Sequence, residues 1–113
     1  MRIINQSKNT ILADEAIIAG TLLKRMIGLL GRKELKKGQA LILKPCNSIH
    51  TFFMRFSIDV LFVDKENKVI KAISSKEPFR LTYMYFTACF AVELPVGTIQ
   101  SSATSPGDSL TLL

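Results

Sequence analysis

Apolar and polar residues alternate along much of this chain, and a period of two is typical of half-buried β-strands. The clearest pair of strands is predicted at residues 58–64 and 68–73, joined by a turn at Lys65-Glu66-Asn67. Further strands are predicted at residues 2–6, 10–13, 40–43, 83–94 and 109–113. Turn residues such as Pro, Gly and Asn separate these segments, so the sequence predicts short strands in succession rather than alternating βα units.

One stretch has helical spacing instead. Leu22, Met26 and Leu29 recur at intervals of three to four residues, with basic residues between them. Thr21 can cap the start of this helix, and Gly31 can end it because glycine tolerates the left-handed conformation. Several short strands and one short α-helix indicate a mainly β fold, either a compact antiparallel β-sandwich or a partly open barrel, formed by residues 1–113 as a single domain.

Composition supports one folded domain. The chain has 113 residues, of which 48% are hydrophobic and 21% charged, with a net charge of +6. Such a chain can bury a core and is not disordered. The first residues lack an apolar segment typical of a signal peptide, so we expect a soluble, basic protein of the cytoplasm. The longest uncharged apolar stretch, residues 81–92, is too short to span a membrane.

The sequence lacks the motifs of several common nucleotide-binding, catalytic and zinc sites. It has no Gly-x-Gly-x-x-Gly motif, no phosphate loop and no Gly-x-Ser-x-Gly motif. Its two cysteines, Cys46 and Cys89, are far apart and offer no Cys-x-x-Cys pair, so a structural zinc site is not supported. We expect both thiols to be reduced and the protein to need no cofactor.

The segment from Cys46 to Asp59 concentrates the candidate chemistry. Cys46, His50 and Met54 are spaced four apart and offer soft donors that suit Cu(I), which makes a metal site one hypothesis. The simpler interpretation is that the Cys and Met side chains are core residues and that His50 is a hydrogen-bonded structural group. We favour the structural interpretation over the metal site.

His50 could also act as a general acid or base beside a carboxylate. Asp59 and Glu93 are the candidate partners, because each lies within an otherwise apolar strand. Alternation along residues 58–64 favours an exposed position for Asp59, and Arg55 could form an ion pair with either carboxylate. Structural ion pairs are the simpler interpretation, and a small hydrolase or isomerase is the alternative.

A basic stretch lies between residues 24 and 37, with six Lys or Arg residues and one Glu. Such a stretch can bind phosphates without sequence selectivity. No aromatic residue lies within it to stack on bases, so binding of nucleic acid is disfavoured.

Residues 49–64, with the run Ile-His-Thr-Phe-Phe-Met-Arg-Phe, resemble the signature of the domain of unknown function 192 family. Residues 25–30, 38–43, 91–97 and 106–108 agree with the same family in order. Ser57 replaces a frequent proline, and Phe53 replaces the tryptophan of many relatives. The resemblance implies a compact, mostly antiparallel β-sandwich or barrel with a short helix, and it implies no reaction.

Our first functional hypothesis is a noncatalytic binding or accessory module for a small ligand or a peptide. Its recognition surface is predicted at the loop from His50 to Phe56 and the Glu93-Leu94-Pro95 turn. The loop supplies apolar area and polar groups that can orient a ligand. Its proposed contacts are His50, Phe52, Phe53, Arg55 and Phe56. The physiological partner and the oligomeric state are left open by the sequence.

The glycines near the C-terminus are predicted to be architectural. Gly97 and Gly107 each follow a proline-containing turn, where a positive φ is needed to reverse the chain. Asp108 is predicted to close its turn by accepting a hydrogen bond from a backbone N–H nearby.

Overall fold

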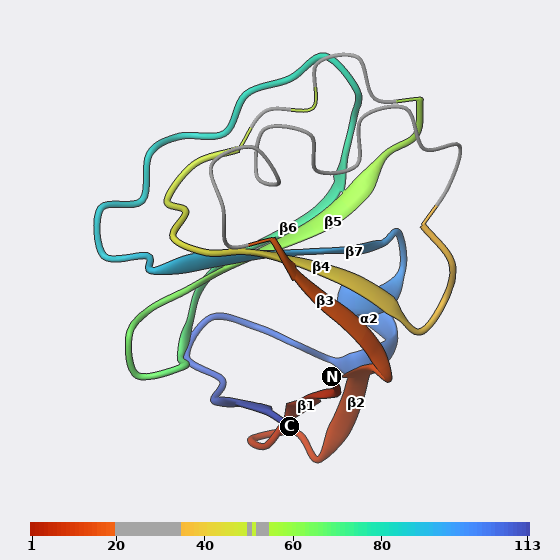
Figure 1. The fold of residues 1–113 in the computed structure, drawn as a ribbon, viewed down its shortest axis with the longest axis vertical. Helices are drawn as coiled ribbons and strands as arrows, with labels where there is room; N and C mark the ends of the chain where they lie inside the picture. Colours follow the sequence, from red (N-terminus) through yellow and green to blue (C-terminus); the bar gives the residue numbers. More distant parts are fainter. Residues whose placement is uncertain (20–34, 50, 52–54) are drawn as a thin grey trace.

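The computed structural model describes residues 1–19, 35–49, 51 and 55–113, which form two β-sheets (Figure 1). A three-stranded sheet has the strand order β2-β1-β8, and a five-stranded sheet has the order β3-β4-β7-β5-β6. The elements are β1 (Ile3–Asn5), β2 (Thr10–Ala13), β3 (Glu15–Ala19), β4 (Gln39–Leu43), β5 (Ile58–Val63), β6 (Val69–Lys76), β7 (Phe90–Pro95), α2 (Thr98–Ser102) and β8 (Leu110–Leu112).

The three-stranded sheet joins the two ends of the chain. β1 lies in the middle and pairs antiparallel with both β2 and β8, so that Ile3 is opposite Ala13 on one side and Leu112 on the other. The N- and C-termini therefore lie close together at one end of the molecule (Figure 1).

Strand β7 occupies the centre of the five-stranded sheet. It pairs antiparallel with β4 and with β5, while β3 pairs parallel with β4 at the edge of the sheet. All six residues of β5 are buried, and so are the first five of β7. Burial on both faces explains why these strands are almost continuously apolar.

The core has two parts, one on each face of the five-stranded sheet. The inner core lies between the sheets and contains Ile42, Leu61 and Val92 with residues of the small sheet such as Ile3. The outer core lies on the opposite face, and its strand residues include Leu41, Leu43, Val60, Phe62 and Ala91. Successive residues of one strand contribute to different parts of the core because side chains alternate across a sheet.

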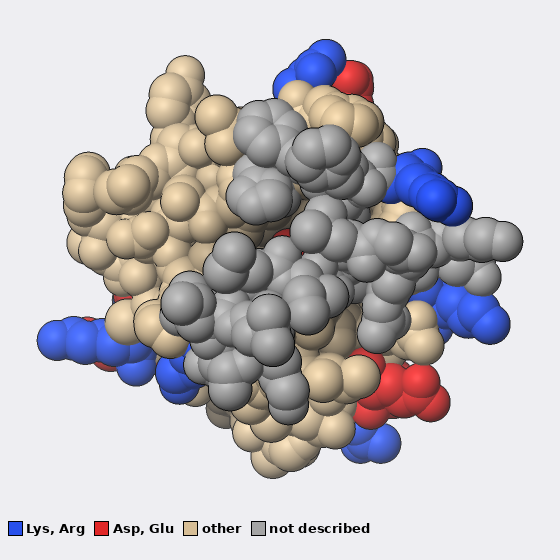
Figure 2. All heavy atoms as spheres, turned by 45° about the horizontal axis from the view of Figure 1, so that its top comes forward, with Lys and Arg blue, Asp and Glu red and all other residues tan. Residues whose placement is uncertain are grey.

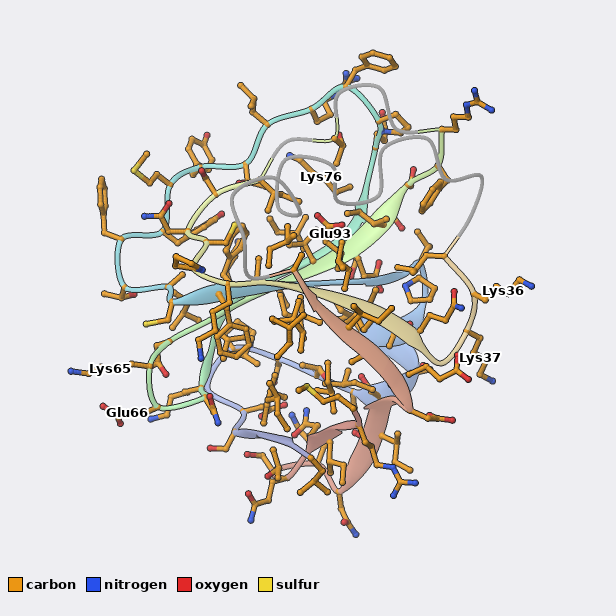
Figure 3. The ribbon with its side chains drawn as sticks, viewed as in Figure 1. Lys36, Lys37, Lys65, Glu66, Lys76 and Glu93 are labelled. Atoms are coloured by element: carbon orange, nitrogen blue, oxygen red, sulfur yellow. The ribbon has the colours of Figure 1, made fainter. Side chains whose placement is uncertain are left out.

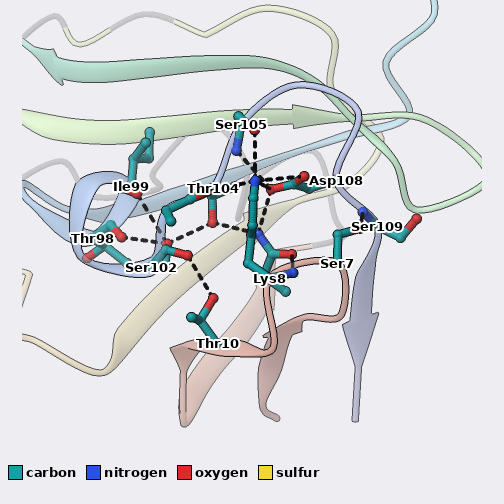
Figure 4. Close-up of polar contacts among 12 residues, drawn as sticks. Ser7, Lys8, Thr10, Thr98, Ile99, Ser102, Thr104, Ser105, Asp108 and Ser109 are labelled. Atoms are coloured by element: carbon teal, nitrogen blue, oxygen red, sulfur yellow. Dashed lines mark hydrogen bonds and ion pairs between the residues drawn. The ribbon is translucent and has the colours of Figure 1, made fainter.

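A polar cluster fastens the first hairpin to the chain before β8 (Figure 4). The Lys8 ammonium lies 2.8 Å from the Asp108 carboxylate, and the Asn5 amide donates to the same carboxylate at 2.9 Å. Burial opposes ionisation of Asp108, but hydrogen bonds from Asn5, Lys8 and Ser105, together with the Lys8 charge, outweigh it and lower the pKa of Asp108 to about 2. The Ser105 N–H donates to Asp108 at 3.0 Å, which confirms the predicted turn.

The structure confirms a mainly β fold with short strands, and its two sheets form no closed barrel in the described part of the chain. The positive φ values predicted for Gly97 and Gly107 are confirmed at 98° and 95°. The helix predicted near residues 21–31 lies outside the described residues. Among the helices described, none is long and apolar enough to cross a membrane.

Three parts of the local prediction were wrong or incomplete. Strand β3 was not predicted, and its pairing with β4 is parallel rather than antiparallel. Residues 83–89 do not continue β7, which begins at Phe90. Helix α2 was missed because it has only five residues and follows a glycine, which resembles an ordinary turn in the sequence.

Candidate binding site around Glu93

Glu93 is a buried carboxyl group at the centre of the five-stranded sheet. In the register of β7 it lies opposite Leu41 of β4 and Val60 of β5. Its neighbour two positions earlier, Ala91, belongs to the outer core, so the alternation of β7 directs the Glu93 side chain to the same face. Figure 3 places Glu93 on the side of the sheet away from the three-stranded sheet.

Within the described part of the chain, both strand neighbours of this carboxyl group, Leu41 and Val60, are apolar. Glu93 is only 4% exposed, and its Oε2 atom has no hydrogen-bond partner within the described part of the chain. Burial raises the pKa of Glu93 from 4.5 to about 8 because an ionised carboxylate loses the solvation that water provides. At neutral pH the group is therefore largely a neutral carboxylic acid, which can donate a hydrogen bond as well as accept one.

Asp59 lies on the other face of the sheet and has a full set of backbone partners. Its Oδ2 atom accepts hydrogen bonds from the N–H groups of Gly97 and Ile99 at 3.1 and 3.0 Å. Its Oδ1 atom accepts from the Ser75 N–H at 2.9 Å. The exposure predicted for Asp59 was wrong, since it is fully buried and both faces of β5 are covered.

The two predicted carboxylates are thus not brought together. Asp59 is opposite Leu94 in the register, and Val60 is opposite Glu93, so the two acidic side chains alternate to opposite faces. Asp59 connects β5 to the start of α2 and to β6, whereas Glu93 has no such contacts among the described residues. Arg55 is exposed and forms no ion pair with Asp59 or Glu93.

Most of the predicted ligand loop lies outside the described residues, which applies to His50, Phe52, Phe53 and Met54. Of the remaining predicted contacts, Arg55 is exposed and Phe56 packs against the outer core, on the same face as Glu93. The roles proposed for this loop, including catalysis by His50 with a carboxylate, stay predictions.

Thr51 was not singled out by the sequence, but it fixes the predicted loop to the rest of the fold. It is fully buried, and its Oγ1 atom accepts a hydrogen bond from the Arg80 N–H at 2.9 Å and donates to the backbone of Glu77. The backbone N–H of Thr51 donates to the Arg80 carbonyl at 2.9 Å. A threonine between His50 and Phe52 carried no signal that would have revealed this contact.

Cys46 and Cys89 both line an open hollow of about 620 Å³. Its other lining residues are Lys44, Pro45, Asn47 and Ala88. The Cys46 N–H donates to the Cys89 carbonyl at 3.0 Å, and the Cys46 thiol donates to the Ser48 carbonyl at 3.0 Å. Neither thiol is in a disulfide, as predicted.

A metal centre finds no support in the described part of the chain. Its residues contain no group of three or more His, Cys, Asp or Glu side chains that could hold an ion. The hypothesis of a site formed by Cys46, His50 and Met54 stays a prediction, because two of these residues lie outside the described ranges.

Comparison with known proteins places this fold in a family. The sequence profile of DUF192, described as an uncharacterized ACR, matches residues 3–112. UPF0127 proteins of Pyrococcus horikoshii and Pyrococcus abyssi are 32% and 33% identical over 113 and 114 residues. Each comparison covers 96% of this chain, together with 96% of the first relative and 94% of the second.

A solved structure agrees with the fold. A protein of unknown function from Novosphingobium aromaticivorans superimposes with a TM-score of 0.82 at 17% identity, over 98% of this chain and 82% of that one. At this identity the likeness concerns the fold alone. The sequence comparisons cover the strands, the Glu93 segment and the last turn together, and the chain belongs to the DUF192 family.

Proposed function

We propose that this protein is a noncatalytic binding module that takes a small ligand on the outer face of its five-stranded sheet, with Glu93 as the polar anchor. The observation that carries the proposal is the buried Oε2 atom of Glu93, which has no hydrogen-bond partner in the described part of the chain. A buried polar atom without a partner is costly and is common at functional sites, where a ligand supplies the partner. The predicted loop of His50, Phe52, Phe53, Arg55 and Phe56 would supply the apolar contacts.

The protonation of Glu93 defines the chemistry of the ligand. A neutral carboxylic acid donates its proton to an acceptor such as a carbonyl or carboxylate oxygen. The net charge of +6 favours the approach of anions, and a neutral Glu93 does not repel them. We therefore expect a small neutral or anionic molecule that presents an oxygen acceptor.

The test uses three small probes of different charge. Acetamide offers a neutral acceptor, acetate an anionic acceptor, and methylammonium a cation without an acceptor. Each is titrated into the ¹⁵N-labelled protein well below pH 8, and amide shifts are followed at Leu41, Val60 and Glu93. Shifts with acetamide or acetate support the proposal. Shifts with methylammonium alone would overturn it, since they would mean that Glu93 binds as an anion.

Two variants separate hydrogen bonding from packing. Glu93→Gln keeps a neutral donor of similar shape, so binding should be retained and should no longer weaken as the pH rises through 8. Glu93→Leu keeps the apolar volume but removes the donor, so binding should be lost. Equal binding by the Leu variant and the natural protein would refute the role of Glu93 as anchor.

A small hydrolase or isomerase is the second candidate function. The raised pKa of Glu93 favours this candidate, because a general acid works best when its pKa is near the pH of the reaction. His50 would be the partner of Glu93, since Asp59 is engaged by three backbone N–H groups. Glu93→Gln again decides: a hydrolysis of p-nitrophenyl acetate that is abolished in this variant, while binding is retained, would favour catalysis over a binding module.

A further inference from the structure

Residues 79–86 form a loop that exposes a run of large apolar side chains, which we call the apolar loop. Tyr83 and Phe86 are 84% and 83% exposed, and Phe79, Leu81 and Met84 are each more than half exposed. Single exposed apolar residues are ordinary on protein surfaces, but five within eight consecutive residues form a patch. Such patches mark surfaces that contact another molecule.

The backbone of the loop is fixed although its side chains are exposed. The Thr82 N–H donates to the Ile49 carbonyl at 3.0 Å, and the Tyr85 N–H donates to the Asn47 carbonyl at 2.8 Å. The Tyr85 ring also packs on the Phe62 ring of the outer core, with 4.6 Å between the ring centroids. Thr82 and Tyr85 thus face inward, whereas Leu81, Tyr83, Met84 and Phe86 are exposed. The backbone contacts hold the exposed side chains away from the core.

The sequence around the apolar loop carries no unpaired negative charge. No carboxylate occurs between Glu77 and Glu93, and Glu77 itself lies 3.4 Å from the Arg80 guanidinium. Figure 2 shows a broad uncharged area over the side of the molecule that carries residues 80–88, with Lys and Arg side chains only at its borders.

A hollow of about 620 Å³ lies next to the loop, between it and strand β6. Two lysines, Lys71 and Lys76, line it together with Ile73, Leu81, Thr82, Tyr83 and Tyr85. Its lining contains no acidic residue, so it can take a phosphate group that reaches it from the side of the exposed rings.

We propose that the apolar loop docks this protein on the surface of a lipid bilayer that contains anionic lipids. Tyr83, Met84 and Phe86 enter the interfacial region, where aromatic side chains are favoured, and Lys71 and Lys76 bind a lipid phosphate. Apolar insertion and attraction to anionic lipid are the two forces that hold peripheral proteins on membranes. The protein lies on the membrane and does not span it.

The position of the charges favours a bilayer over a nucleic acid. A single strand needs basic groups along its backbone next to the rings that stack on its bases. Residues 81–88, which include both of the most exposed rings, contain no Lys or Arg, and the two lysines of the hollow come from strand β6 on one side of the loop. They can meet one phosphate there, but they do not follow the run of rings as the backbone of a single strand would require. A second copy of this chain is also a poorer occupant, because a stable dimer buries about 800 Å² on each subunit across complementary surfaces, whereas this patch is a single projecting loop.

The first experiment places a fluorescent reporter in the loop. The sequence has no tryptophan, so Phe86→Trp introduces a single reporter, and Ile11→Trp on β2 is the matched control at a residue 59% exposed. Each variant is mixed with vesicles of phosphatidylcholine and phosphatidylglycerol, or of phosphatidylcholine alone. Emission from position 86 should shift to the blue with the anionic vesicles, while emission from position 11 should not. Unchanged emission at position 86 would overturn the proposal.

The second experiment measures sedimentation with the same vesicles. Tyr83→Ser with Phe86→Ser should lower the partition coefficient by about tenfold or more, because burial of one aromatic side chain is worth at least this factor. Lys71→Gln with Lys76→Gln should remove the preference for phosphatidylglycerol. The control Ile11→Ser with Leu113→Ser should partition like the natural protein, because strand β2 and the C-terminus lie at the end of the molecule away from residues 79–86 (Figure 1).

Two further measurements can contradict the proposal. Thermal melts of the loop variants should match that of the natural protein, so that a change in binding is not a change in folding. Sedimentation velocity without lipid would overturn the proposal if the natural protein is a dimer and the Tyr83/Phe86 variant a monomer. Binding of a single-stranded oligonucleotide that is lost in the same variant would also overturn it.

Discussion

The pH dependence of stability provides a direct test of the Glu93 environment. Glu93 has a folded pKa raised to about 8 from 4.5, so the folded state binds its proton more tightly than the unfolded state does. The stabilisation from this proton is complete below pH 4.5 and is lost progressively as the pH rises toward 8. Above pH 8 the carboxylate is ionised in both states, and the free energy of unfolding no longer depends on this group.

The size of the effect follows from the two pKa values. Each tenfold difference in proton affinity is worth about 1.4 kcal/mol, so the change from 4.5 to about 8 amounts to at most about 5 kcal/mol. This is a large share of the stability of an ordinary domain, which is about 5–15 kcal/mol. The natural protein should therefore unfold at a lower urea concentration at pH 8 than at pH 5.

Glu93→Gln isolates this contribution. The glutamine is a neutral isostere of the protonated acid, so the two proteins should have similar stability near pH 4.5, and the variant should become the more stable one as the pH rises. Urea unfolding of both proteins over this range gives a difference curve in which other titrating groups, His50 included, cancel. A flat difference curve between pH 4.5 and 8 would refute the buried, unpartnered carboxyl on which the proposed function rests.

Further predictions concern the architecture. In the same urea assay, Asp59→Asn should lower the free energy of unfolding by about 3 kcal/mol, because the asparagine turns an N–H donor toward buried N–H groups. The control Asp64→Asn, in an exposed turn, should lower it by less than about 1 kcal/mol. The lowered pKa of Asp108 predicts that stability falls as the pH drops from 3.8 through about 2, and Asp108→Asn should remove this fall in acid titrations followed by circular dichroism. Gly97→Val and Gly107→Val should each lower stability by about 1 kcal/mol or more in thermal melts, since both glycines have a positive φ; unchanged melts would contradict this.

The candidate site was visible in the sequence only in part. Glu93 could be singled out because a charged residue within the run Phe90–Pro95 breaks an otherwise apolar pattern. Asp59 gave the same signal from the same type of strand, yet it accepts three backbone hydrogen bonds while Glu93 accepts none from the described residues. Local sequence cannot distinguish these two carboxyl groups, because the N–H groups that bind Asp59 belong to residues 16, 38 and 40 positions away in the chain.

At the apolar loop, the sequence predicted a strand where the structure has none. Its aromatic and β-branched composition predicts a strand, and strand propensity measures how well a side chain fits a half-buried pleated surface. Strand β7 begins only at Phe90, where the chain enters the sheet between β4 and β5. The preceding residues have similar propensity but belong to none of the strands of the described part of the chain, and Tyr83 and Phe86 are exposed.

The sequence by itself determined the local features of this protein. Alternation fixed the first hairpin and the β5–β6 pair, and the glycines at positions 97 and 107 fixed two turns, because these features depend on neighbours only a few residues apart. Tertiary structure alone decided that β7 lies at the centre of the sheet, that β3 pairs parallel with β4, and that Asp59 and Glu93 face opposite cores. These outcomes depend on contacts between distant segments, and the burial of a residue is a property of the segments that cover it rather than of its own type.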